Sequence, residues 1–141
     1  MAHLGKRLLV VGLPAVVIAM ASASTPIASA GTSASARLRS CTGGLLLEPT
    51  GTVVLACADA NTEIRATRWT SWTNTGARGT TDFGLNLCTP TCVASRISFF
   101  PDSTIRLTAA KHTPHGLLFT RAVISYRLHG VQKTFTAYPA T

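Results

Sequence analysis

Short apolar runs separated by turn residues recur along the chain after residue 41, and no stretch sustains an apolar repeat of 3.6 residues. The runs contain Val, Ile, Thr and aromatic residues, and Gly, Pro, Asn and Asp lie between them, a pattern that predicts β-strands. The sequence therefore predicts an all-β protein. Eight strands are expected, at 45–47, 52–57, 64–73, 80–87, 95–99, 104–109, 117–128 and 131–138.

The last two expected strands can be paired from the turn between them. A two-residue loop at 129–130 sets Leu128 opposite Val131, and the same register places Ala122 opposite Ala137. Because side chains alternate with a period of two, one face then collects the apolar residues and the other the arginines and threonines. Several short strands at this spacing favour a sandwich or a small barrel, and we expect a disulfide-stapled, immunoglobulin-like β-sandwich.

The first thirty residues have a different pattern. Lys6 and Arg7 precede thirteen uncharged, mostly apolar residues at 8–20, and small residues follow up to Ala30. A positive start, a short apolar run and an Ala-x-Ala exit predict a signal peptide at 1–30 that is cleaved after Ala30. The alternative is a membrane anchor, but a spanning helix needs roughly 20 apolar residues. The sequence thus predicts a secreted protein with no membrane span.

The mature chain is expected to have a flexible lead-in at 31–40 and a single β domain at 41–141. Without the signal peptide it keeps eleven basic and five acidic residues, a formal charge of +6 against +8 for the whole chain. The basic residues are spread along the strands, whereas nucleic-acid binders usually gather them on one face. Spread charge mostly keeps a protein soluble, and an anionic partner outside the cell, such as a wall polymer, fits it equally well. Nucleic acid is not the expected partner.

Four cysteines form an even set that should be oxidised after export. Of the three possible pairings we favour Cys41–Cys57, which spans two turn-rich segments, and Cys88–Cys92, which closes a short loop around Pro90. A bridge across a loop as long as the first contributes about 3 kcal/mol in the loop-entropy description. The alternative, a zinc site of four thiolates, suits the wide 41/57 spacing poorly. We expect no metal and no cofactor.

Two pairs of residues are candidates for ligand binding. Trp69 and Trp72 are three residues apart, so on a regular strand they point to opposite faces. One would then be buried and the other could be exposed. Two structural tryptophans are the expected interpretation, and the alternative is that the exposed one stacks against a sugar ring. Asp59 and Asn61 offer oxygens of the kind that Ca²⁺ prefers, but two oxygens are too few to hold the ion. An Asx-turn that caps the backbone is their expected role.

No catalytic motif of a serine hydrolase, zinc protease or P-loop enzyme occurs, so the chain is not expected to be an enzyme. His112 and His115 flank a proline, which favours a surface loop over a metal site. Nothing in the sequence places two carboxylates within the roughly 5–9 Å that glycoside hydrolysis needs. The carboxylates are Glu48, Asp59, Glu63, Asp82 and Asp102.

Three short elements follow one another in the chain: Leu-Ala-Cys-Ala-Asp-Ala-Asn at 55–61, the tryptophans at 69 and 72, and Cys-Thr-Pro-Thr-Cys at 88–92. In this order they resemble a group of uncharacterised small secreted proteins of actinobacteria. The resemblance covers roughly 52–138 and loosens at 99–102, where the group has a Tyr-Pro-Val-type strand and this chain has Phe-Phe-Pro-Asp. It implies export and disulfides, and it implies no activity.

Three hypotheses about function follow. The leading one is a non-enzymatic extracellular module that binds an anionic cell-envelope polymer or a glycan. It depends on the small β scaffold, the missing catalytic motif and the positive charge. The second is a secreted protease inhibitor that presents the loop at 88–95, and the third is a small hydrolase that uses carboxylates.

Overall fold

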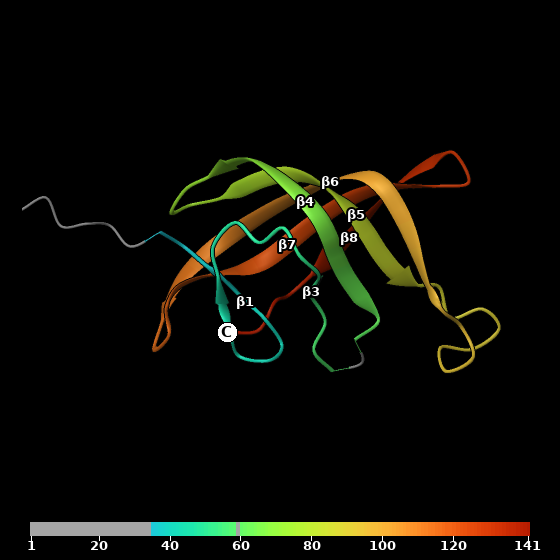
Figure 1. The fold of residues 1–141 in the computed structure, drawn as a ribbon, viewed down its shortest axis with the longest axis horizontal. Coiled ribbons are helices and arrows are strands. Elements are labelled where there is room, and N and C mark those ends of the chain that lie inside the picture. Colours follow the sequence, from blue (N-terminus) through green and yellow to red (C-terminus); the bar gives the residue numbers. More distant parts are fainter. Residues whose placement is uncertain (1–34, 59) are drawn as a thin grey trace, which may run out of the picture. The chain divides into compact units, whose positions relative to one another are not determined.

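The structure is a computed structural model that describes residues 35–58 and 60–141. These residues belong to one structural unit, Thr32–Thr141. The expected signal peptide and most of the expected lead-in lie outside the described residues. Eight strands and no helix make up the described part, which confirms the all-β prediction (Figure 1).

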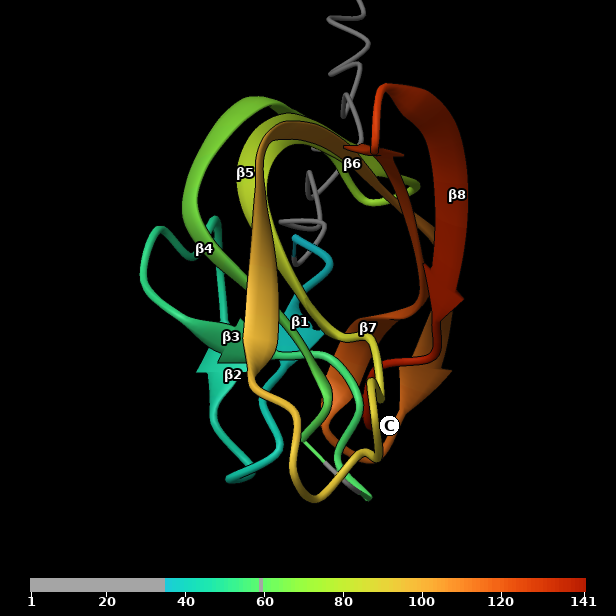
Figure 2. The same cartoon turned by 90° about the vertical axis from the view of Figure 1, so that its right-hand side faces the viewer.

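Six strands form one antiparallel sheet in which each strand pairs with the next one along the chain. Two short strands, β1 (Leu38–Arg39) and β2 (Leu45–Leu46), pair separately. The sheet curls into a half-barrel around these N-terminal strands (Figure 2). A single meander differs from the two packed sheets of an immunoglobulin-like sandwich, so that part of the prediction is not what the topology shows. The six strands are β3 (Val53–Val54), β4 (Thr62–Trp72), β5 (Ala77–Asn86), β6 (Ile97–Thr113), β7 (Gly116–Leu128) and β8 (Val131–Ala137).

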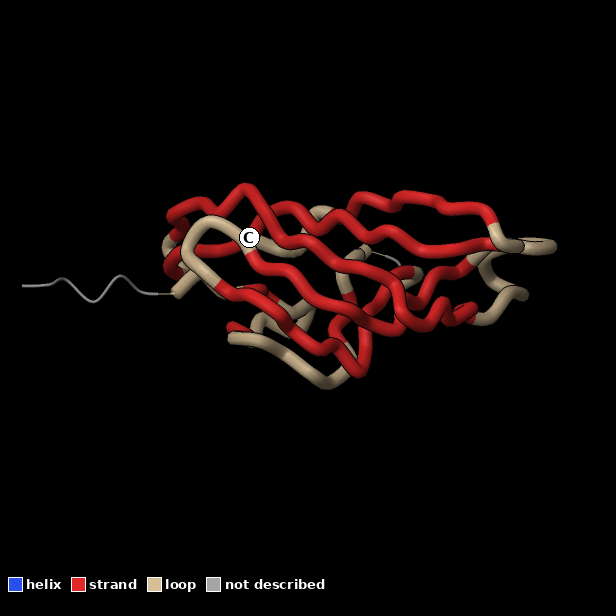
Figure 3. The backbone as a smooth tube through the Cα atoms, turned by 90° about the horizontal axis from the view of Figure 1, so that it is seen from above, coloured by secondary structure: helices blue, strands red, loops and turns tan. Residues whose placement is uncertain are grey.

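Bulges bend the long strands and help the sheet to curl. The register between β4 and β5 shifts twice, and that between β5 and β6 shifts once, opposite Asp82. The sequence predicts a turn at Pro101 and Asp102 that separates two strands. Instead both residues lie within one continuous strand, β6, where they form the bulge opposite Asp82. Figure 3 shows that the long strands are bent along their length. A bulge tolerates proline because no ladder hydrogen bond has to be donated there.

The hairpin of β7 and β8 has the predicted register. Leu128 lies opposite Val131, and the pairing continues to Ala122 opposite Ala137. The two loop residues at 129–130 have φ values of 50° and 78°, as a two-residue type I′ turn requires. The prediction of this hairpin is confirmed, including which of its faces is buried.

The core lies on the concave side of the sheet, where the N-terminal segment covers it. Rings from β5 and β7 meet there, with the Phe83 and Tyr126 centroids 5.0 Å apart. Among the described residues, no buried polar side-chain atom lacks a hydrogen-bond partner. The core side chains fill the concave side, and the alternate side chains of the same strands face the solvent on the convex side. The largest fully buried apolar side chains are Leu38, Leu55, Ile64, Phe83, Ile105, Leu107, Leu118, Phe119 and Ile124.

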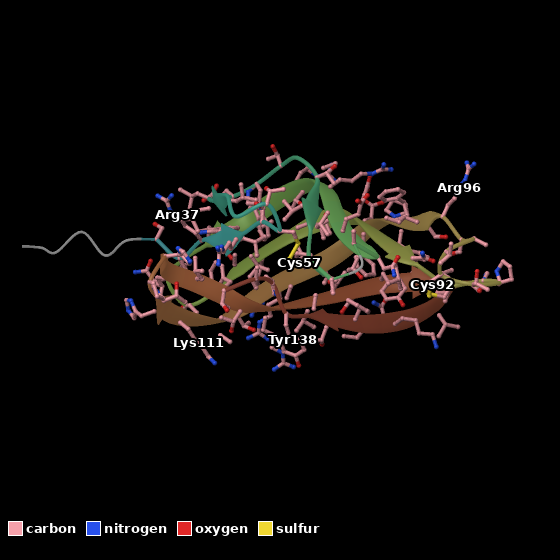
Figure 4. All side chains as sticks on the ribbon, turned by 90° about the horizontal axis from the view of Figure 1, so that it is seen from below. Arg37, Cys57, Cys92, Arg96, Lys111 and Tyr138 are labelled. Carbon is pink, nitrogen blue, oxygen red and sulfur yellow. A yellow bond between two sulfur atoms is a disulfide. The ribbon has the colours of Figure 1, made fainter. Side chains whose placement is uncertain are left out.

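Both predicted disulfides, Cys41–Cys57 and Cys88–Cys92, are formed, and no cysteine is free to ligate zinc. The first joins the β1–β2 segment to the chain that follows β3; Figure 4 labels its Cys57 end. Two disulfides are typical of a protein that folds in an oxidising compartment. A search of the described residues finds no helix with the length and apolar character needed to cross a bilayer.

Candidate functional site

Side-chain alternation along β5, β6 and β7 sends one set of residues into the core and the other set outward. The inward set is apolar or small and is buried. In the stretch around Arg106 the outward set consists of arginines, hydroxyl-bearing residues and one valine, while Asp82, Asp102 and Arg127 lie further along the same strands. We call this surface the arginine–threonine face. Its members on these strands are Arg78, Thr80, Thr104, Arg106, Thr108, Arg121, Val123 and Ser125.

Three arginines lie near one another on the arginine–threonine face. Arg78 of β5 lies directly opposite Arg106 of β6. Arg121 of β7 lies opposite Thr108, which is two residues along β6 from Arg106. Residues directly opposite each other in a sheet have Cβ atoms about 5 Å apart, and diagonal neighbours are about 7–8 Å apart. All three side chains are exposed, so they form one patch of positive charge.

No acidic side chain of the described chain is paired with these arginines. The two ion pairs found there, Arg65–Asp82 and Arg68–Asp102, are each 3.7 Å long and include none of the three. Like charges directly opposite each other destabilise a sheet. Repulsion between these arginines therefore lowers the stability of the folded protein. Proteins accept such a loss of stability mainly at functional sites.

A row of hydroxyl groups crosses the sheet beside the arginines. Thr80, Thr104, Ser125 and Thr134 lie opposite one another on β5, β6, β7 and β8. Their side chains make no hydrogen bond to other residues that the structure describes. The hydroxyls can therefore donate to a ligand and accept from it. We call these four residues the hydroxyl row.

A depression of about 540 Å³ lies between the hydroxyl row and the first two arginines. Its lining combines hydroxyl, guanidinium and aliphatic groups and includes neither an aromatic ring nor a carboxylate. Arg106 also lines two neighbouring depressions, one of which Arg121 lines as well. The central arginine of the patch is thus shared by three adjoining hollows.

Trp69 and Trp72 lie together, and the prediction that they point to opposite faces is wrong. A register shift between Trp69 and Ser71 breaks the alternation along β4, because a bulge adds one residue. The two rings meet edge to face with centroids 4.7 Å apart. Their indole N–H groups donate to the carbonyls of Pro49 (3.0 Å) and Ala36 (2.7 Å). Both side chains hold the N-terminal segment against the sheet, and neither lines the depressions of the arginine–threonine face.

Asp59 lies outside the described residues, so its predicted capping role stays a prediction. Asn61 is joined to Asn86 at the base of the loop that follows β5. The Asn86 side-chain amide donates to Asn61 Oδ1 (3.0 Å), and the Asn86 backbone N–H donates to the Asn61 carbonyl (2.9 Å). Asn61 therefore supports that loop.

The two histidines lie at the hairpin between β6 and β7. His112 lies within β6, where the sequence predicts a loop, and His115 lies in the turn before β7. Both are exposed. No group of three His, Cys, Asp or Glu side chains that could hold a metal ion is found in the part of the chain that the structure describes.

The loop at 88–95 is held in a compact turn by the Cys88–Cys92 disulfide and by its own backbone. The Ser95 N–H donates to the Thr91 carbonyl (3.0 Å), which completes a turn. The Asn86 amide holds the loop from below by donating to the Cys92 carbonyl (2.8 Å). An inhibitor segment that enters a protease cleft as a substrate does has to be extended in order to pair with the cleft. The closed turn does not offer such a segment, which weighs against the inhibitor hypothesis.

The sequence interpretation missed the arginine–threonine face because it counted the arginines as spread. They are spread along the chain, yet the registers of β5, β6 and β7 bring three of them together. The pattern that could have identified them is an alternation of Arg with Thr, Ser or Val at 78–80, 104–108 and 121–125. Each segment places these residues on the same face of its strand.

Comparison with known proteins gives no assignment. No protein-family model matches the sequence, and neither the curated proteins nor the solved structures include a significant match. The resemblance to small secreted actinobacterial proteins therefore stays a prediction.

Proposed function

We propose that this protein is a secreted, non-enzymatic module that binds an anionic polymer of the cell envelope through the arginine–threonine face. One observation carries the proposal. Arg78, Arg106 and Arg121 gather on a single outward face, and no carboxylate lines the depressions beside them. A cluster of like charges that the fold does not neutralise favours an anionic partner from outside the chain.

A polymer suits this face better than a small anion does. A single exposed ion pair contributes only about 0–1 kcal/mol, because water and salt screen it. A chain with repeated charges engages several arginines at once, and each contact raises the effective concentration of the next charge. Guanidinium groups also present a fork of donors that fits oxyanions in a bidentate way.

The chemistry of the depression supports binding over turnover. Nucleophilic catalysis by Thr or Ser needs a base within hydrogen-bond reach, usually His or a carboxylate. The main depression is lined by neither. Among the carboxylates of the hydrolase hypothesis, Asp82 and Asp102 each face an arginine in an ion pair. Each of these two carboxylates therefore has a charged partner within the fold, which suits a structural role.

Export is supported by two separate features. The segment at 1–30 has the pattern of a signal peptide with a cut after Ala30. The two disulfides require an oxidising compartment to form and persist.

The test is sedimentation of the mature protein with purified cell walls at low salt. The variant Arg78→Glu/Arg106→Glu/Arg121→Glu is compared with a control that has the same change in net charge, Arg37→Glu/Arg96→Glu/Lys133→Glu. The control residues are exposed and line none of the depressions, and Arg37 and Arg96 lie at opposite ends of the sheet (Figure 4). We expect retention of the wild type and the control and loss of the first variant. No retention of the wild type, or equal loss in both variants, contradicts the proposal.

A further inference from the structure

The charged and hydroxyl groups of the arginine–threonine face are arranged in adjacent rows, not mixed at random. Arg78 and Arg106 share one level of the sheet, and Thr80 and Thr104 share the next level on the same face. On β7 the corresponding positions are Val123 and Ser125. Neighbouring strands lie about 4.8 Å apart, so each row repeats at that spacing. The depression of about 540 Å³ lies between the two rows.

This arrangement favours a ligand with charge along one side and hydroxyl groups along the other. A phosphodiester in a polymer backbone has two free oxygens that accept from a guanidinium fork. Polyol or sugar units between the phosphates offer hydroxyls that can donate to and accept from threonine and serine.

Nucleic acid fits the same face less well. Single strands bind proteins by stacking their bases on aromatic rings, in addition to contacts with the phosphates. The depressions that Arg106 lines contain no aromatic side chain. Phe83 and Tyr126 pack into the core from the other face, whereas Tyr138 is exposed past the end of β8 and lines none of these depressions.

We propose that the ligand of the arginine–threonine face is a chain of polyol or sugar units joined by phosphodiesters. The phosphates bind the arginines, and the hydroxyls of the units bind the hydroxyl row. This inference rests on the proposed function and adds the chemical class of the polymer. It also gives the hydroxyl row a role in binding, which attraction between the arginines and an anion does not require.

The test is calorimetric titration with four polymers at equal concentrations of charge: poly(glycerol phosphate), polyglutamate, dextran sulfate and oligothymidylate. We expect poly(glycerol phosphate) to bind at least about tenfold more tightly than the other three. Because Thr80→Val/Thr104→Val removes two hydrogen bonds to the ligand, it should weaken that binding by about tenfold. Binding of the other polymers should not change. Valine keeps the shape and the strand preference of threonine.

The control for the hydroxyl row is Thr136→Val, which alters the same kind of side chain on β8 and lines none of the depressions. This variant should bind like the wild type. Equal binding of all four polymers, lost in the triple arginine variant, overturns the phosphodiester inference and leaves the proposed function standing. Tightest binding of oligothymidylate overturns the inference in favour of nucleic acid. If no polymer binds in an arginine-dependent way, both proposals fail.

Discussion

The two faces of the sheet are built from the same strands, yet their polar and charged groups are satisfied in different ways. On the concave face, the indole N–H groups of Trp69 and Trp72 donate to backbone carbonyls. The buried hydroxyls of Thr67 and Thr81 hydrogen-bond each other at 2.9 Å. On the convex face, Arg78 and Arg106 lie opposite each other without a carboxylate partner. Folding alone accounts for the concave face and does not account for the convex one. In the proposed function, an anionic ligand completes the electrostatics of the convex face.

The largest effect on stability should come from the centre of the concave face. Phe83 is fully buried and its ring lies near those of Phe100, Tyr126 and Phe135. Phe83→Ala removes these contacts and leaves a cavity, so we expect a loss of about 3–5 kcal/mol in the free energy of unfolding. Urea denaturation measures it. A loss below about 1 kcal/mol would show that the concave side is not the core that holds the sheet.

The long-range disulfide should be the next largest contribution. Replacing Cys41 and Cys57 by serine removes a bridge with a sequence separation of 16 residues. The loop-entropy description assigns about 3 kcal/mol to such a loop and less to the shorter loop closed by Cys88 and Cys92. Parallel denaturation of the two double variants measures the difference. A greater loss from the Cys88/Cys92 variant contradicts the view that the first disulfide secures the covering segment.

A smaller effect is expected where the covering segment meets the sheet. Trp72→Phe keeps a ring against Phe119 and removes the N–H that donates to the Ala36 carbonyl. An acceptor that loses its donor costs about 1–3 kcal/mol. Thermal unfolding and hydrogen exchange at 36–39 should both detect the loss. Unchanged exchange at these positions would mean that the indole does not hold the segment.

The sequence predicts the fold best where the geometry is local. A two-residue turn and strict alternation are sufficient to define the β7–β8 hairpin, because the turn sets the register and the register sets the faces. Both disulfides follow from spacing and turn composition. The residues involved are close together in the chain, so few arrangements compete.

The sequence predicts less where a strand bends. Whether Pro101 and Asp102 end a strand or form a bulge depends on the curl of the whole sheet, and the same is true of the bulge beside Trp69. Alternation fails at each bulge, so predictions of facing fail beyond it. The arginine patch was missed for a related reason. It requires the registers of β5 with β6 and of β6 with β7, whereas local pattern defines only the register of β7 with β8.

The smallest effect on stability, and the most informative, should come from the convex face. Arg106 is exposed, lies opposite Arg78 and has no ion-pair partner in the described chain. Arg106→Gln removes a repulsion, so we expect the free energy of unfolding at low salt to stay the same or to rise by about 0.2–1 kcal/mol. The rise should vanish at high salt, because mobile ions screen the repulsion. Arg65→Gln is the matched control. Arg65 pairs with Asp82, and its Cζ lies 3.4 Å from the centroid of the Phe99 ring, so this substitution removes favourable contacts. That variant should lose stability.

The most direct test of the central claim is the melting temperature of the wild type and of Arg106→Gln, each with and without poly(glycerol phosphate). A ligand that binds only the folded state raises the melting temperature according to its affinity. We predict that without polymer the variant melts at or slightly above the wild-type temperature, and that the polymer stabilises the wild type clearly more than the variant. A variant that melts lower without polymer, together with equal stabilisation of both proteins by the polymer, would show that the arginines serve the fold and not a ligand.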